Sequence, residues 1–263
     1  MSKDTSISPQ ADAQESLVVR DVTVADLRYA LSEALNDFKA MPSHAVFLVV
    51  IYPIAGALLF GFVFNYDMLQ MVFPLVAGFA LLGPVAAIGL YELSRRREQG
   101  LSIHWTDVVN IVRSPSALPI AALSMVLLAV FALWLATASA IYELYFGAGV
   151  PDSLGALLAD VIGTAPGRRL LIVGTGVGFL FALVTFAFTV ISFPLLLDRR
   201  VGAPEAAATS IRVVLANPFT MGLWALIIVA LLVIGSLPAL VGLAVVLPVL
   251  GHASWHLYRR AVA

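Results

Sequence analysis

Long apolar runs, separated by short clusters of charge, constrain this chain more than any other feature of its sequence. Of the 263 residues, 61% are hydrophobic and only 12% are charged, whereas soluble domains carry about 25% charged residues. So few charges could not cover a surface that faces water, and the surface is therefore expected to face lipid. The sequence predicts an all-α, polytopic membrane protein.

Six of the apolar runs are close to the roughly 20 residues that a helix needs to cross a bilayer. They cover residues 44–64, 68–91, 117–141, 170–196, 219–236 and 238–257. The last two runs nearly touch, which predicts a tight hairpin, and one re-entrant unit is the alternative. We expect a disordered polar tail at 1–20 and a single six-helix membrane domain at 21–263.

The basic residues predict which side of the membrane each loop occupies, because cytoplasmic loops are enriched in Lys and Arg. Thirteen of the fifteen basic residues lie in the two tails and in the loops after the second and fourth runs. The exceptions are Arg168 and Arg169, in the long loop before the fourth run. This bias predicts that both termini are cytoplasmic.

A recurring order of features suggests three pseudo-repeated units, at about 21–97, 103–200 and 203–260. Each would consist of an amphipathic helix, a proline and a transmembrane hairpin that ends in an arginine pair. The residue before a proline avoids helical angles, so the proline favours a bend between helix and span. The amphipathic helices are expected to lie in the cytoplasmic interface. Polar loops with chance periodicity are the alternative.

The expected apolar faces of these three helices follow from their spacing. The first face carries Leu27, Leu31, Leu35 and Phe38, the second Val108, Ile111 and Val112, and the third Ile211, Val214 and Leu215. Thr23 and Asp26 resemble a capping box for the first helix, Thr106 is the expected cap of the second, and Pro204 suits the first turn of the third. A further short helix is predicted in the loop at 142–169, with a partly ordered loop as the alternative.

The glycines of the fourth run predict helix packing. The stretch VGTGVGF at 173–179 superficially suggests a nucleotide-binding loop, but no strand precedes it and it lies in an apolar run. Gly174 and Gly178 are spaced four residues apart, which allows helices to approach closely.

Two histidines near the end of the sixth run could share a metal ion or haem. His252 and His256 are four residues apart and therefore fall on one helical face. Two ligands make a weak site, and a polar rim that bonds headgroups or neighbouring helices is the alternative. We predict no cofactor.

Charged residues at the ends of the even spans are expected to form this rim. The candidates are Glu92, Asp198, Arg199, Arg200, Arg259 and Arg260. Glu92 aligns with His256 in the repeat. Ionisable groups at membrane depth are candidates for function, but these residues lie close to arginines that water reaches, which favours a structural role.

The central parts of the spans carry hydroxyl groups and no charged residue or histidine. This absence argues against an ion-coupled transporter, although a passage for neutral or amphipathic molecules stays possible. No set of nucleophile, base and orienting group is visible, so we predict no catalytic residue and no enzyme activity. Membrane lipids and a membrane-protein complex are the expected partners, and nucleic acid is not.

The stretches FPLLLDRR at 193–200 and LPVLGHASWHLYRRAV at 247–262 resemble an uncharacterised family of bacterial six-span inner-membrane proteins. The resemblance covers most of 20–262 and implies a bacterial cytoplasmic membrane, without an activity. We expect a membrane scaffold or accessory factor. The alternatives are a transporter or channel for a small neutral or amphipathic substrate, and a metal- or haem-linked respiratory accessory protein.

Overall fold

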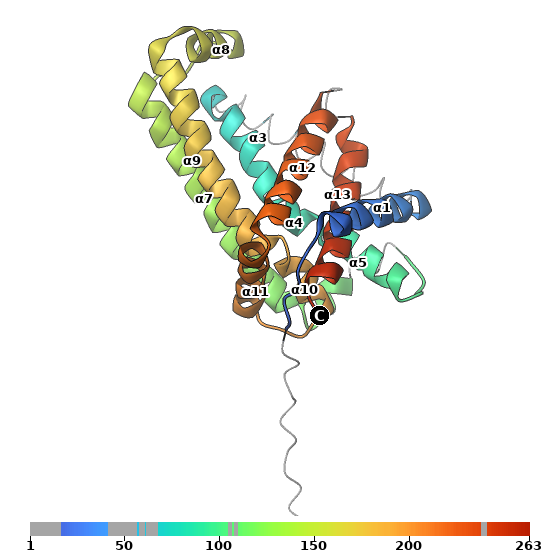
Figure 1. Cartoon of the computed structure of the whole chain (residues 1–263). Helices are drawn as coiled ribbons and strands as arrows, with labels where there is room; N and C mark the ends of the chain where they lie inside the picture. The colour runs from blue at the N-terminus through green and yellow to red at the C-terminus, as the bar shows by residue number, and fades with distance from the viewer. Residues whose placement is uncertain are drawn as a thin grey trace, which may run out of the picture.

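The computed structural model describes residues 17–41, 68–104, 110–237 and 241–263, together with positions 57, 61 and 107. This part of the chain is helical apart from turns, connecting segments and one isolated β-bridge (Figure 1). The expected all-α class is therefore confirmed. The first predicted span, 44–64, lies outside the described residues except for two of these positions.

Three helices are long and apolar enough to cross a membrane, judged by length and composition. They are α7 (Ala117–Phe146), α9 (Ala165–Thr189) continued by α10 (Ser192–Asp198), and α12 (Pro218–Ser236). These helices coincide with the third, fourth and fifth predicted runs. The sixth run forms α13 (Leu243–Ala261).

The second predicted run, 68–91, is broken into shorter helices and extends further than expected. It comprises η1 (Leu69–Met71), α3 (Val72–Leu81), α4 (Gly83–Ala86) and α5 (Ile88–Glu98). Pro84 lies in the first turn of α4, and because proline has no N–H it cannot continue the hydrogen bonds of the preceding helix. The chain therefore restarts as α4 and reaches its arginines in α5.

The helices α7 and α9 form a long hairpin with α8 (Leu154–Gly163) at its far end (Figure 1). The short helix predicted in the loop is thus present. A Cβ at Gly167 would lie only 2.2 Å from the carbonyl oxygen of Asp160, so α8 and α9 meet at a corner that only glycine fits. Thr164 caps α9 by accepting a hydrogen bond from the backbone N–H of Gly167 at 3.0 Å.

The break between α9 and α10 is closed by α11 (Ala203–Ala216). The hydroxyl of Ser210 donates to the carbonyl of Ala187 at 2.8 Å and accepts from the backbone N–H of Ile191 at 3.2 Å. In an unbroken helix these two backbone groups would bond each other. The buried hydroxyl therefore completes the helix ladder and fixes α11 against the break.

The first amphipathic helix is α1 (Val24–Ala40), and its predicted capping box is present. The backbone N–H of Asp26 donates to the hydroxyl of Thr23 at 3.3 Å, and the N–H of Thr23 donates to the carboxylate of Asp26 at 2.9 Å.

The buried faces of α1 and α11 agree only in part with the faces that their large apolar residues predicted. In α1 the alanines Ala30 and Ala34 are fully buried while Leu35 is 44% exposed. In α11 the buried face includes Ala206, whereas Leu215 is 73% exposed. Leu27 is in the core as expected, and Leu31 and Phe38 pack against it, while the small side chains let each helix approach its neighbour closely.

Before α7, the described positions 107 and 110 are α-helical, and the short 3-10 turn η2 (Ile111–Arg113) follows them. Ile111 is buried but Val112 is 77% exposed, so the prediction that they share a packed face is wrong. A turn of this length does not bring neighbouring residues onto one face. Thr106 and Val108 lie outside the described residues.

The two ends of the described chain pair with each other. Val19 and Val262 form an antiparallel bridge, supported by a hydrogen bond from the N–H of Ala263 to the carbonyl of Val18 at 3.0 Å. Residues 17–20, which the sequence assigned to the polar tail, are therefore part of the fold.

Asn217, between α11 and α12, holds this terminal segment in place. Its side-chain oxygen accepts from the backbone N–H of Val22 at 2.7 Å, and its amide donates to the carbonyl of Arg20 at 3.1 Å. The N-terminal segment is thus bonded both to the C-terminus and to the start of α12.

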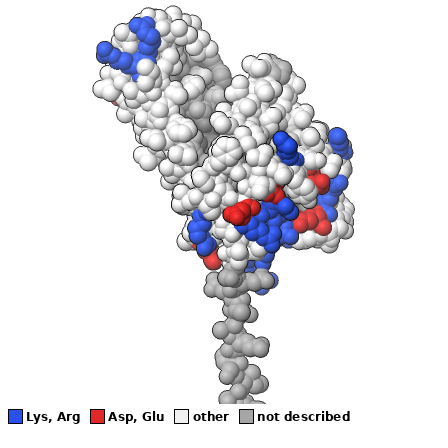
Figure 2. Space-filling view, in the orientation of Figure 1, with Lys and Arg blue, Asp and Glu red and all other residues white. Residues whose placement is uncertain are grey.

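Charged residues gather at one end of the molecule (Figure 2). Both signs are mixed there, around the region of α5 and the C-terminal part of α13, and a smaller basic patch lies at the opposite end near α8. Much of the surface between them is uncharged in this view. The candidate site lies at the mixed-charge end.

Candidate polar site between α1, α5 and α13

The site forms where α1, α5 and α13 pack together. The helix α1 lies along α13, and α5 also packs against α13. A Cβ at Gly251 would lie 2.4 Å from Cδ1 of Leu90, so the glycine allows the close approach of α5. Because the three helices meet here, polar side chains from distant parts of the sequence come within hydrogen-bonding distance.

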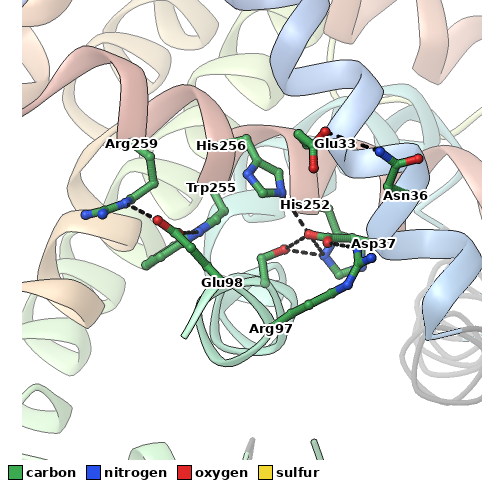
Figure 3. A network of polar contacts seen from close by, with 10 residues as sticks. Glu33, Asn36, Asp37, Arg97, Glu98, His252, Trp255, His256 and Arg259 are labelled. Carbon is green, nitrogen blue, oxygen red and sulfur yellow. Dashed lines mark hydrogen bonds and ion pairs between the residues drawn. The ribbon is translucent and has the colours of Figure 1, made fainter. Parts of the chain in front are cut away.

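Asp37 is the centre of the cluster and is only 2% exposed (Figure 3). Its carboxylate accepts from the hydroxyl of Ser94 at 2.5 Å and contacts Nε2 of His256 at 2.8 Å. Arg97 donates to its other oxygen. One residue of α1 is thereby bonded to both α5 and α13.

The pKa of Asp37 reflects this setting. Burial opposes the charged form, but the hydrogen bonds from His256, Ser94 and Arg97 outweigh it and hold the pKa of the carboxyl group below its ordinary value of 3.8. Asp37 is therefore a carboxylate at neutral pH, and the cluster is an ion-paired joint.

His252 forms the innermost part of the cluster and is fully buried. Its Nδ1 lies 2.7 Å from the hydroxyl oxygen of Ser94. Since Ser94 uses its proton on Asp37, Nδ1 carries the hydrogen of this contact. In the part of the chain that the structure describes, Nε2 of His252 has no hydrogen-bond partner.

The order of these groups differs from that of a hydrolase triad. In a triad the histidine lies between the serine and the carboxylate, whereas here Ser94 lies between Asp37 and His252. Ser94 is also only 1% exposed. The arrangement holds helices together and does not present an activated nucleophile.

A second polar group extends the cluster toward α10. Glu98 accepts from Nε1 of Trp255 and from Nε of Arg259, both at 3.0 Å. Asp198 accepts from the hydroxyl of Tyr258 at 2.7 Å and from Nη1 of Arg259 at 3.1 Å. Arg259 therefore bridges α5 and α10 from α13.

The remaining rim candidates form pairs along and between helices. Glu92 accepts from Nε of Arg95 at 2.8 Å within α5. Arg260 donates through Nε to Asp26 of α1 at 2.6 Å and lies over the ring of Tyr29. Arg199 lies 3.7 Å from its neighbour Asp198, and Arg200 is exposed.

The structure brings His252 and His256 to one carboxylate, where each has a different hydrogen-bond partner. Among the residues that it describes, no group of three His, Cys, Asp or Glu side chains could hold a metal ion.

Sequence reasoning missed Asp37, Ser94 and Arg97. One signal was available, since Asp26 and Asp37 share a helical face with two alanines and complement the basic end of α13.

The two packing glycines have different surroundings. A Cβ at Gly178 would lie 3.0 Å from the ring of Trp134, whereas one at Gly174 would meet nothing within 4 Å. The same indole lies against Gly78 of α3 and donates to the carbonyl of Pro74 at 2.8 Å. Trp134 thus joins α3, α7 and α9.

Comparison with known protein families supports the conclusion that this chain is an integral membrane protein. Residues 72–198 match the family described as "Predicted integral membrane protein (DUF2189)". The resemblance to an uncharacterised membrane-protein family is thereby confirmed. No curated protein matches the chain, and no solved structure does.

Proposed function

We propose that this integral membrane protein, whose residues 72–198 carry the family match, is a membrane scaffold or accessory factor without catalytic activity. The main support is how hydroxyl groups within the apolar helices are used. Ser124 donates to Ile120 at 2.8 Å and Thr137 donates to Leu133 at 2.7 Å, each within its own helix. These hydroxyls are satisfied locally, so they are not set out as the lining of a passage.

The charged end supports the same function. Its acids and arginines bond mainly to each other and join α1, α5, α10 and α13. Groups used in this way stabilise one arrangement of helices. The resulting bundle would offer lipids and a protein partner a fixed apolar surface, which suits an accessory role in a membrane complex.

We further propose six spans in three repeated units, in a bacterial cytoplasmic membrane with both termini in the cytoplasm. The pairing of Val19 with Val262 supports an even number of crossings, because it requires both residues to lie on the same side. The mixed-charge end in Figure 2 supports a cytoplasmic location for that side. The tip near α8 would then be periplasmic.

Single cysteines would test this placement, because the chain has none of its own. We expect Ser153→Cys, at the start of α8, to react with a membrane-impermeant maleimide in intact cells. We expect Glu205→Cys, in the first turn of α11, to react only after permeabilisation. The proposed orientation would be rejected if, in intact cells, both cysteines were labelled or only the cysteine at position 205 were labelled.

Affinity purification from native membranes in mild detergent tests the accessory role. A partner that is recovered in a fixed ratio, and whose recovery resists a mild salt wash, is the expected result. Reconstitution into liposomes provides the opposing measurement. Solute flux above that of empty liposomes, together with the absence of a stoichiometric partner, would favour a transporter over a scaffold.

A further inference from the structure

A polar pocket of about 440 Å3 lies beside Asp37, between α1, α5 and α13. Three arginines and three acids line it: Arg97, Arg259, Arg260, Glu33, Asp37 and Glu98. Their formal charges cancel when the nearby histidine is neutral. The pocket therefore carries both signs of charge at the end of the bundle where the charged residues gather.

Four of these six charges are already paired across the pocket wall. Arg97 pairs with Asp37, and Arg259 pairs with Glu98. Each pair satisfies its own charge, so a ligand would gain little from competing with it.

The other two charges, on Arg260 and Glu33, have no ion-pair partner among the residues that line the pocket. Arg260 donates through Nε to Asp26, which is not part of the lining, and its side chain is 53% exposed. Glu33 accepts from the amide of Asn36 at 3.2 Å and has no ion pair among the residues that the structure describes. One positive and one negative group therefore face the pocket.

Arg260 contacts the same helix, α1, that carries Glu33. The guanidinium carbon of Arg260 lies 5.5 Å from the ring centre of Tyr29. Tyr29 and Glu33 are four residues apart, so they share a helical face and lie about 6 Å apart along the axis. Arg260 therefore lies against the turn of α1 that precedes Glu33.

We propose that this pocket binds a phosphoethanolamine group, with its phosphate on Arg260 and its ammonium on Glu33. A guanidinium binds phosphate oxygens in pairs, and a primary ammonium donates hydrogen bonds to a carboxylate. A simple anion would be repelled by Glu33, and a simple cation would be repelled by Arg260. A short zwitterion satisfies both.

The same chemistry occurs in the headgroup of an aminophospholipid and in free phosphoethanolamine. The lipid as source rests on the proposed function, which places this end of the bundle at the membrane surface. Anionic and zwitterionic headgroups lie at that depth, beside basic residues that flank the spans. If affinity purification recovers no protein partner, the lipid binding measured at this pocket is unaffected, so the two proposals can fail separately.

The test is a binding measurement on the full chain in detergent micelles. Short-chain phosphatidylethanolamine is compared with phosphatidylglycerol, which lacks the amine, and phosphatidylcholine, whose amine cannot donate a hydrogen bond. We expect phosphatidylethanolamine to bind at least about tenfold more tightly than either. Glu33→Gln and Arg260→Gln should each weaken its binding about 10- to 100-fold, the usual effect of losing a charged hydrogen bond.

Matched variants separate ligand contacts from loosening of α1. Asp26→Asn removes the partner of Arg260 on α1 but keeps the arginine, so its binding should be unchanged or tighter. Glu205→Gln and Arg169→Gln, which lie away from the pocket, should bind as the unaltered protein does. If Asp26→Asn weakens binding as much as Arg260→Gln, the arginine acts by holding α1 and the proposal is overturned.

The choice of lipid gives the other decisive outcomes. Equal binding of phosphatidylethanolamine and phosphatidylglycerol, or unchanged binding in Glu33→Gln, would refute a site for the ammonium. Binding of free phosphoethanolamine without binding of the lipid would support the pocket chemistry and refute the headgroup as its source.

Discussion

Replacing Asp37 with asparagine tests whether the polar cluster holds α1 on the bundle. The side chain is 2% exposed and interacts with Ser94, Arg97 and His256. Each hydrogen bond to a charged group contributes about 1.5–3 kcal/mol, but these contributions are not independent. Asparagine keeps one acceptor oxygen, and the arginine is 37% exposed, which weakens its share. We expect the free energy of unfolding to fall by about 2–4 kcal/mol.

The assay is equilibrium unfolding in mixed micelles, followed by tryptophan fluorescence, with hydrogen exchange of the amides of α1 as a second readout. Faster exchange across α1 should accompany the loss of stability. The control is Asp21→Asn, the same change at an exposed residue just before α1. A change below about 0.5 kcal/mol, the usual size of a surface substitution, with unaltered exchange of α1, would refute the role given to the cluster.

Three further predictions concern packing and pH. Ser210→Ala removes the hydroxyl that bonds both sides of the break before α10 and should lower the free energy of unfolding by about 1–3 kcal/mol. The control Ser254→Ala should lower it less, because this hydroxyl bonds its own helix. Thermal unfolding in detergent compares the two variants. Gly251→Val forces α5 and α13 apart and should lower the free energy of unfolding by about 1–3 kcal/mol. The control Gly174→Ala should not destabilise the protein, because its new methyl group meets nothing within 4 Å. If Gly174→Ala were the more destabilising of the two in the same assay, the packing argument would be contradicted. The pKa of Asp37 is below 3.8 in the folded protein, so its contribution is present above pH 3.8 and is lost as the pH falls through the folded pKa. Unfolding measured at decreasing pH should show this loss beginning near pH 3.8 and continuing below it, and Asp37→Asn should reduce it. An equal loss in the variant would assign the pH dependence to other groups.

The apolar helices could be predicted closely because length and composition are local properties of the sequence. The fifth run was expected at 219–236 and α12 spans Pro218–Ser236. The second run shows the limit of this reasoning. A continuous helix was expected there, but the chain has turns at Leu82 and Ala87, on either side of the short helix that contains Pro84.

The polar site was less predictable because its contacts join residues far apart in the chain. His256 and Asp37 are separated by 219 positions, and Asn217 and Val22 by 195. Spacing placed both histidines on one face, which was correct for any α-helix, but it could not supply their partners. The buried face of α1 was predicted only in part, because Leu27 is buried as expected but the alanines, which allow close contact, were not counted as part of that face.

The association of α1 with α13 sets an order on the biogenesis of the protein. Helix α1 leaves the ribosome long before α13, which is its main partner among the described helices, and the bridge at Val19 needs Val262. During synthesis the acidic residues of α1 must therefore stay hydrated at the membrane surface. The bundle can close around them only after α13 has been made, so products truncated before α13 would keep α1 undocked and open to quality-control proteases.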